Sequence, residues 1–174
     1  MNKITTRSGL LLTVLAMLTL LALPLRAEDA GKVLQMTFSV RNGTGDNPMI
    51  VAWLETAGGD YVKTLQLFSK DSKYYKEMLA WRFKSKTVDK DPAVDAVSGA
   101  TIKWSKHATI SVPVTQDGRN LLDGSYVLRI ESRKDKAGHY RNFKIPFGKD
   151  FAGGKFEDAG YVESIEIAVK DAAK

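Results

Sequence analysis

Short apolar segments separated by turn residues set the strongest limit on how this chain can fold. Where apolar and polar residues alternate, the apolar side chains share one face of a β-strand. Seven segments have strand character: residues 33–40, 49–54, 61–68, 107–112, 126–132, 139–147 and 162–169. Of these, 49–54 is apolar throughout, which predicts a fully buried strand, whereas the glycine-rich stretch 148–160 is predicted as a loop. The pattern predicts a mainly β fold, an immunoglobulin-like β-sandwich.

One segment breaks the strand pattern and predicts a helix inserted in the middle of the sandwich. Between residues 72 and 86, apolar residues recur every three or four positions, with lysine and glutamate between them. This spacing is typical of one amphipathic helix, for which Asp71 or Ser72 can serve as the N-cap. Residues 87–101 are predicted as a loop, because Pro92 lacks the backbone donor that a helix needs.

The N-terminal segment predicts export from the cytoplasm. Lys3 and Arg7 precede an apolar run over residues 10–23, and the small residue Ala27 stands before the acidic Glu28. These are the three parts of a cleavable bacterial secretory signal peptide. The alternative is a membrane anchor, but the apolar run is shorter than the roughly 20 residues that a membrane span needs.

We therefore expect residues 1–27 to be removed and residues 28–174 to form a single β-sandwich domain in the periplasm. Removal of the leader takes away Lys3, Arg7 and Arg26, and leaves 23 basic against 20 acidic residues. The formal net charge falls from +6 to +3, so we expect no nucleic-acid partner. We also expect that the chain is not an integral membrane protein once the leader is removed.

Residue types missing from the chain exclude several kinds of chemistry. There is no cysteine, which rules out disulfides, thiolate catalysis, cysteine-ligated zinc and iron–sulfur clusters. Two histidines, His107 and His139, are too few for a histidine-rich metal site. We expect the fold to be stabilised by its apolar core alone, without a metal.

A motif of small residues lies in the predicted loop. Asp95, Ser98, Gly99, Ala100 and Thr101 have the order Asp-x-x-Ser-Gly-Ala-Thr. Small neighbours and a mobile loop would let another enzyme's active site reach the threonine hydroxyl. The alternative is an ordinary loop, since serine, glycine and alanine are common in loops.

This motif resembles the acceptor site of extracytoplasmic flavoproteins, among them the FMN-binding subunits of the sodium-pumping quinone reductase. In those proteins an FAD:protein FMN transferase attaches FMN to the final threonine through a phosphoester. The resemblance implies that Thr101 is the acceptor and that Asp95 helps to position or activate it. It predicts a periplasmic electron-transfer flavoprotein, an electron carrier more than a self-contained enzyme.

A second resemblance covers most of the chain after the leader. Residues 48–55 and 61–65, then Trp81 and the Ser-Gly-Ala-Thr loop, resemble the family called domain of unknown function 2271, whose members are predicted periplasmic proteins. That family is associated with FMN transferases and PepSY-type membrane reductases, which implies both as partners. Residues 117–126 are similar to the immunoglobulin-like repeat of flagellar hook-capping proteins, a likeness of fold only.

Aromatic and basic residues around the motif have two interpretations. Trp104 is a candidate FMN-binding residue, but packing in the core is an equally good interpretation of it. For Trp81, packing in the core is favoured over flavin binding. Tyr74 and Tyr75 cannot both face inward on one helix. The lysines between residues 70 and 106 form either a solvated surface or a basic one that accommodates the phosphate of FMN.

Two other functions are weighed against the flavoprotein. A cofactor-free immunoglobulin-like module would bind a partner protein or glycan through its loops, and would stay colourless when co-expressed with an FMN transferase. A hydrolase is disfavoured, because no base lies near any candidate nucleophile in the sequence.

Overall fold

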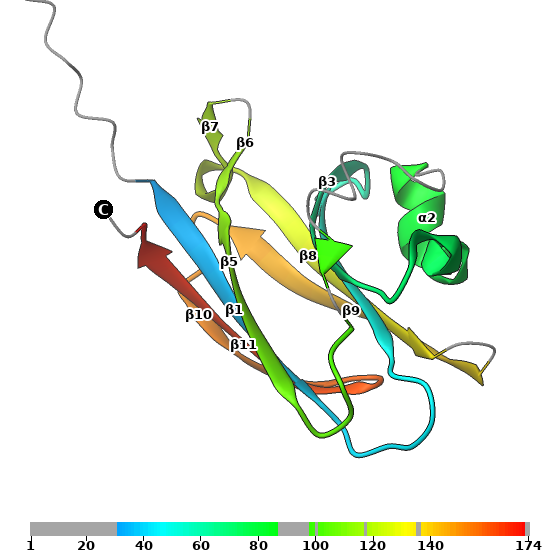
Figure 1. The fold of residues 1–174 in the computed structure, drawn as a ribbon. Coiled ribbons are helices and arrows are strands. Elements are labelled where there is room, and N and C mark those ends of the chain that lie inside the picture. Colours follow the sequence, from blue (N-terminus) through cyan, green and yellow to red (C-terminus); the bar gives the residue numbers. More distant parts are fainter. Residues whose placement is uncertain (1–30, 87–97, 100, 117, 135–136, 173–174) are drawn as a thin grey trace, which may run out of the picture.

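Two β-sheets packed face to face form the body of the computed structural model (Figure 1). The structure describes residues 31–86, 98–99, 101–116, 118–134 and 137–172, so the predicted signal peptide lies outside the described residues. The elements are β1 Lys32–Val40, β2 Met49–Thr56, β3 Tyr61–Phe68, the 3₁₀ helix η1 Ser72–Glu77, α2 Leu79–Ser85, β4 Ser98–Gly99, β5 His107–Pro113, β6 Thr115–Gln116, β7 Arg119–Asn120, the 3₁₀ helix η2 Leu121–Asp123, β8 Ser125–Lys134, β9 Ala137–Gly148, β10 Gly153–Ala159 and β11 Val162–Asp171. The predicted mainly β sandwich is confirmed.

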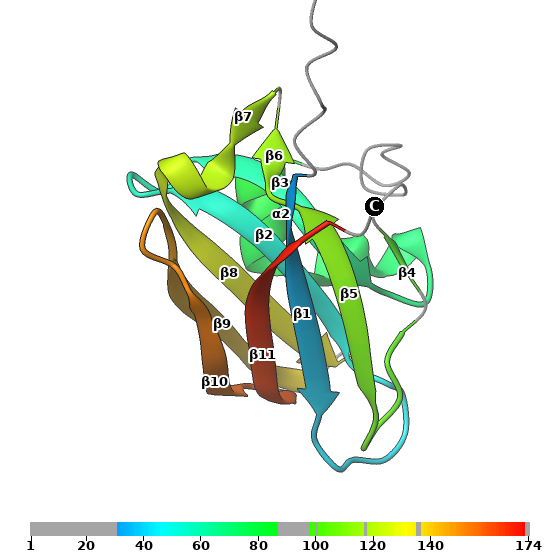
Figure 2. The ribbon, with the colours of Figure 1, turned by 90° about the vertical axis from the view of Figure 1, so that its left-hand side faces the viewer.

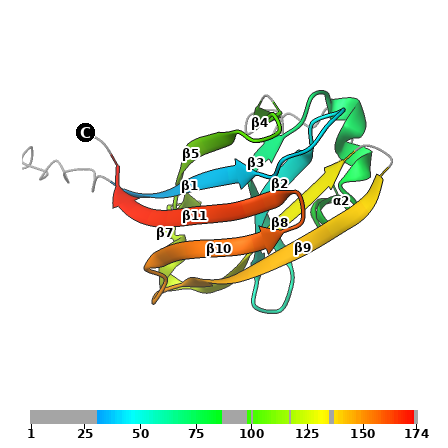
Figure 3. The same cartoon turned by 90° about the horizontal axis from the view of Figure 1, so that it is seen from below.

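The first sheet has the strand order β10-β11-β1-β5, and the second has the order β4-β3-β2-β8-β9. All pairs in the two sheets are antiparallel except β3 with β4, which is parallel. Figure 2 looks onto the first sheet, and Figure 3 shows its strands side by side from below. A small ribbon of β6 and β7 completes the strands of the described residues.

β1 shows how the alternating pattern builds the core between the sheets. Its even-numbered residues from Leu34 to Val40 are buried, while the residues between them are partly exposed. Phe38 meets Phe68 edge to face, with ring centroids 5.5 Å apart. The buried positions pack against apolar residues of β2 and β8: Ile50, Ala52, Leu54, Leu128 and Ile130. Burial of this apolar surface is the main source of stability in a fold without disulfides.

The outer face of the second sheet is also covered, by the helical segment η1–α2 (Figure 1). Seven of the eight residues of β2 are buried, because one face of this strand lines the core and the other lies beneath the helices. This explains why its sequence is continuously apolar. The second apolar cluster contains Met49, Val51, Trp53, Leu67, Tyr75, Met78 and Trp81.

The helical segment differs from the single helix predicted. The N-cap prediction at Asp71 is confirmed, since its side chain accepts the N–H of Lys73. Met78 then interrupts the helix with φ −85° and ψ 76°, and its fully buried side chain packs in the second cluster. A new helix starts there because the Glu131 carboxylate on β8 accepts the N–H of Trp81 at 2.9 Å. Burial and capping together favour the break over a continuous helix.

The loop predicted for residues 148–160 is also corrected, because β10 lies within it. Gly153 adopts φ +98° and Gly154 φ +153°, so the start of this strand needs a backbone that other residues rarely take. A Cβ on Gly153 would lie 2.3 Å from the carbonyl oxygen of Ile167 on the neighbouring strand. The glycines therefore permit close strand pairing here.

Candidate functional site

The described part of the Ser-Gly-Ala-Thr motif is built into the second sheet. Ser98 and Gly99 form β4 and pair with the end of β3. The N–H of Ser69 donates to the carbonyl of Gly99 at 3.2 Å, and Ile102 is buried in the main core. The loop predicted for residues 87–101 is thus corrected at Ser98 and Gly99, and Thr101 lies in sequence between β4 and the buried Ile102. Asp95 and Ala100 of the motif lie outside the described residues.

The hydroxyl of Thr101 has an unusual environment. Its Oγ1 is buried and has no hydrogen-bond partner in the described part of the chain. Most buried polar groups are hydrogen-bonded, and leaving one unpaired costs about 1–3 kcal/mol. Within the described residues, the hydroxyl of Thr101 therefore takes no part in the hydrogen bonding that stabilises the fold.

Thr101 contributes to the wall of a pocket of about 350 Å³. This volume lies within the range of roughly 300–1,000 Å³ that is typical of small-molecule sites. Three segments meet there: the loop before β2, the chain that enters η1, and the motif. The lining residues are Gly45, Asp46, Asn47, Met49, Lys70, Tyr74 and Thr101.

The turn into η1 places a cation and an aromatic ring in this wall. Asp71 caps the helix, and its hydrogen bond from the N–H of Lys73 lowers the pKa of the Asp71 carboxyl. Tyr75 is then buried beneath the helix, while its neighbour Tyr74 is half-buried and lines the pocket. The two tyrosines therefore differ in burial, but Tyr74 also packs against the second cluster, which contains Tyr75.

Positively charged side chains lie around the pocket on two sides. The Lys73 ammonium lies 5.0 Å from the centre of the Tyr74 ring, and Lys70 lines the pocket itself. Lys134 of β8 donates to the carbonyl of Thr44 at 2.8 Å, in the loop that forms the opposite wall. Asp46 is the acidic residue of the lining. The described cations around the cavity would favour an anionic ligand group.

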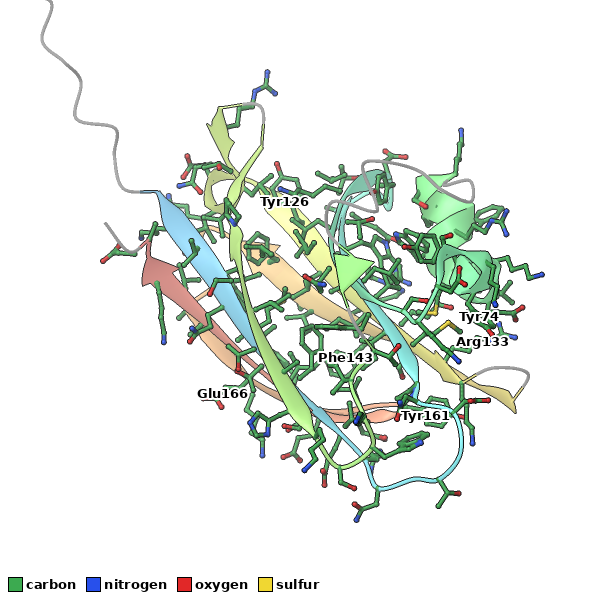
Figure 4. All side chains as sticks on the ribbon, viewed as in Figure 1. Tyr74, Tyr126, Arg133, Phe143, Tyr161 and Glu166 are labelled. Carbon is green, nitrogen blue, oxygen red and sulfur yellow. The ribbon has the colours of Figure 1, made fainter. Side chains whose placement is uncertain are left out.

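Trp104 holds the pocket loop in place and is not among the residues that line the cavity. Its indole N–H donates to the carbonyl of Gly45 at 3.2 Å, and its backbone N–H donates to Asn47 Oδ1 at 3.3 Å. The ring meets Tyr161 edge to face at 5.8 Å and packs against the main core. A Cβ on Gly43 would lie 2.5 Å from the indole, so this loop passes directly over the ring. In Figure 4, Tyr161 lies beside this loop and Tyr74 is on the helical segment.

Trp81, for which core packing was favoured, is fully buried in the second cluster. Its indole N–H donates to Thr64 Oγ1 at 2.8 Å. This side chain therefore anchors α2 on the sheet and is separate from the pocket lining.

The sequence predicted Thr101 and Trp104 as site residues and included Lys70 in a run of lysines and Tyr74 among several aromatic residues, but the wall formed by the loop before β2 was missed. That loop, residues 41–48, contains the turn-forming residues Asn42, Gly43, Gly45, Asn47 and Pro48. Its approach to Thr101 depends on contacts with Trp104 that are distant in sequence. The available signal was an unusually long turn, residues 41–48, between two strongly predicted strands.

The described residues contain no group of three histidine, aspartate or glutamate side chains placed to hold a metal ion. They also contain no helix with the length and apolar character that crossing a membrane requires. The residues around Thr101 are instead of the kinds that bind a phosphate and a flat ring, a lysine and a tyrosine.

Comparison with known proteins gives one match. Residues 32–165 match the model of a family described as "Predicted periplasmic protein (DUF2271)". This description agrees with the periplasmic location predicted from the N-terminal segment. No curated protein and no solved structure gives a significant match to the chain.

Proposed function

We propose that this chain, which belongs to the DUF2271 family of predicted periplasmic proteins, carries FMN covalently on Thr101 and acts as an electron carrier. One observation carries the proposal: the acceptor residue of the motif has a buried hydroxyl without a partner in the described structure, in the wall of a pocket of ligand size. Such an orphaned group is costly to stability, so its presence favours a chemical role.

The pocket residues fit the parts of the proposed group. Lys70 would pair with the negative charge of the phosphoester, and the Tyr74 ring offers a flat surface to the isoalloxazine. Lys73 adds positive charge on the Tyr74 ring. Trp104 would act through the loop that it positions, rather than by touching the flavin. FMN would supply reversible electron transfer, and Lys70 and Tyr74 would hold it.

Attachment requires a second enzyme and FAD. A bond forms between Thr101 Oγ1 and the phosphorus on the FMN side of FAD, while the bond that joins this phosphorus to AMP breaks. AMP leaves, and the proton of the hydroxyl is lost with it. Because Oγ1 is buried in the folded chain, the transferase must meet a form in which this hydroxyl is exposed.

The remaining motif positions keep their proposed roles. Asp95 would position or activate the acceptor hydroxyl, and the small residues Ser98, Gly99 and Ala100 would let the FAD:protein FMN transferase reach it. A PepSY-type membrane reductase is the proposed source of electrons. These roles come from the resemblance of the motif to flavoprotein acceptor sites.

Co-expression of the full chain with an FAD:protein FMN transferase tests the proposal. After denaturation, the chain should keep flavin fluorescence on a gel, and Thr101→Ala should remove it. Thr101→Ser retains an acceptor hydroxyl and is the matched control, which should keep part of the signal. A dark parent chain, or equal fluorescence in Thr101→Ala, contradicts the proposal, and the dark chain would favour the cofactor-free binding module.

A further inference from the structure

Helix α2 exposes two large apolar side chains that the sandwich does not cover. Leu79 is 54% exposed and Phe83 is 80% exposed, and no other large apolar side chain among the described residues is as exposed. They lie four positions apart on one helix, so they share a face. Other large apolar residues of the described structure are buried or partly buried. Exposed apolar side chains that lie together often mark a site of interaction.

The exposure does not come from a loosely held helix. Trp81, between the two exposed residues, is fully buried and hydrogen-bonded to Thr64. The Glu131 carboxylate caps the helix start, and the Lys84 ammonium donates to the carbonyl of Gly59. The sheet therefore holds α2 firmly and presents Leu79 and Phe83 to solvent.

The segment that carries this pair is basic. The segment from residue 72 to residue 86 has one acidic residue, Glu77, whose carboxylate lies 3.8 Å from Arg133. Lys76 and Lys86, on either side of the apolar pair in sequence, are both exposed. The basic residues of the segment are Lys73, Lys76, Arg82, Lys84 and Lys86.

We propose that α2 docks on an anionic phospholipid surface, with Phe83 and Leu79 in the interface and Lys76 and Lys86 at the phosphates. An aromatic and an aliphatic side chain beside lysines is the combination that interfacial helices use. A helix on the outer face of the sandwich fits a deformable lipid surface, whereas a protein partner would need a matching groove. With only two apolar side chains, binding is reversible.

This inference does not depend on the flavin. If both hold, docking brings the Thr101 pocket near the membrane, because η1 supplies Tyr74 to the pocket and leads directly into α2. The protein would then meet a membrane reductase by diffusion along the bilayer surface.

Vesicle flotation tests the docking, with protein purified from the soluble periplasmic extract of cells that express the full chain. Vesicles of phosphatidylglycerol with phosphatidylethanolamine should carry the protein upward, and vesicles of phosphatidylcholine should not. Phe83→Ser should lower the partition coefficient by about tenfold or more, because a large apolar side chain no longer enters the interface. Lys76→Gln with Lys86→Gln should lower it further and remove most of its salt dependence.

Lys170→Gln is the matched control for charge. Lys170 is exposed near the end of β11, and β11 belongs to the sheet on the side of the sandwich away from α2 (Figure 1). Its loss should leave binding within about twofold of the parent. Unchanged thermal unfolding of Phe83→Ser shows that the fold is intact. No flotation with anionic vesicles, or an equal loss in Phe83→Ser and Lys170→Gln, overturns the proposal.

Discussion

Thr101 and Thr64 both have hydroxyl groups inside the fold, but only Thr64 has described partners for it. The Thr64 hydroxyl accepts the indole N–H of Trp81 and bonds with the hydroxyl of Tyr61 at 2.8 Å. The Thr101 hydroxyl has no partner in the described structure. Within the described residues, the Thr64 hydroxyl therefore stabilises the fold, whereas burial of the unpaired Thr101 hydroxyl lowers the stability of the fold.

Thr101→Val tests this difference in the chain without flavin. Removal of an unpaired buried hydroxyl at nearly constant volume should raise the free energy of unfolding by about 1 kcal/mol. Thr64→Val, the matched control, should lower it by about 1–2 kcal/mol, because the Trp81 indole N–H loses its acceptor. Urea denaturation measures both values. Equal losses in the two variants would mean that the Thr101 hydroxyl has a structural role.

Gly43→Ala tests the role of Trp104 in shaping the pocket. The new Cβ would lie 2.5 Å from the indole ring, so the ring or the loop must move. We expect a loss of about 1–3 kcal/mol in unfolding free energy and weaker flavin attachment. Gly58→Ala, whose nearest neighbouring atom would be 3.7 Å away, should have little effect on either. A Gly43→Ala chain as stable as Gly58→Ala would contradict the proposed positioning.

At the scale of elements, the start of α2 depends on a carboxylate from a distant strand. Glu131 is fully buried on β8 and accepts the N–H groups of Trp81 and Ala80. Burial raises the pKa of Glu131 above its usual value of 4.5, although these N–H groups and Arg133 act in the opposite direction. The native state therefore binds the Glu131 proton more tightly than the unfolded chain does.

This shift predicts a pH dependence with a definite sign. As pH rises from about 4.5 through the raised pKa, ionisation of Glu131 lowers the free energy of unfolding. Glu131→Gln removes this contribution, so the stability of the variant relative to the parent should increase with pH in this window. Denaturation at several pH values, with the exposed Glu163→Gln as control, measures the difference. A difference that is constant with pH, or that falls, would contradict the cause assigned here.

The strands were the most predictable elements, and the connections between them were the least. Alternation placed β3 at the same bounds, Tyr61–Phe68, and located β1, β2 and β5 with small differences at their ends. β10 was missed because its glycines signal a loop unless the partner strand is known. The break at Met78 was missed because the cap comes from Glu131, about fifty residues later in the sequence.

On the scale of the whole molecule, the sequence pattern predicted the β-sandwich but not the order of the strands within each sheet. Nothing in the apolar periodicity indicates that β1 lies between β11 and β5, or that β2 joins β3 to β8. The continuous apolar run of β2 did predict a strand buried on both faces, and the helices supply its second cover. Thr101 was predictable as a motif residue, but its pocket arises from three segments that only the fold brings together.

The central claim is that the molecule is a scaffold for FMN on one threonine. Tryptic cleavage after Lys90 and Lys103 would release residues 91–103, in which Ser98 and Thr101 are the hydroxyl residues. After co-expression with an FMN transferase, mass spectrometry of this peptide should show the added mass of FMN less one water, with the fragment ions placing it on Thr101. An unmodified peptide, or a modification on Ser98, would contradict the account.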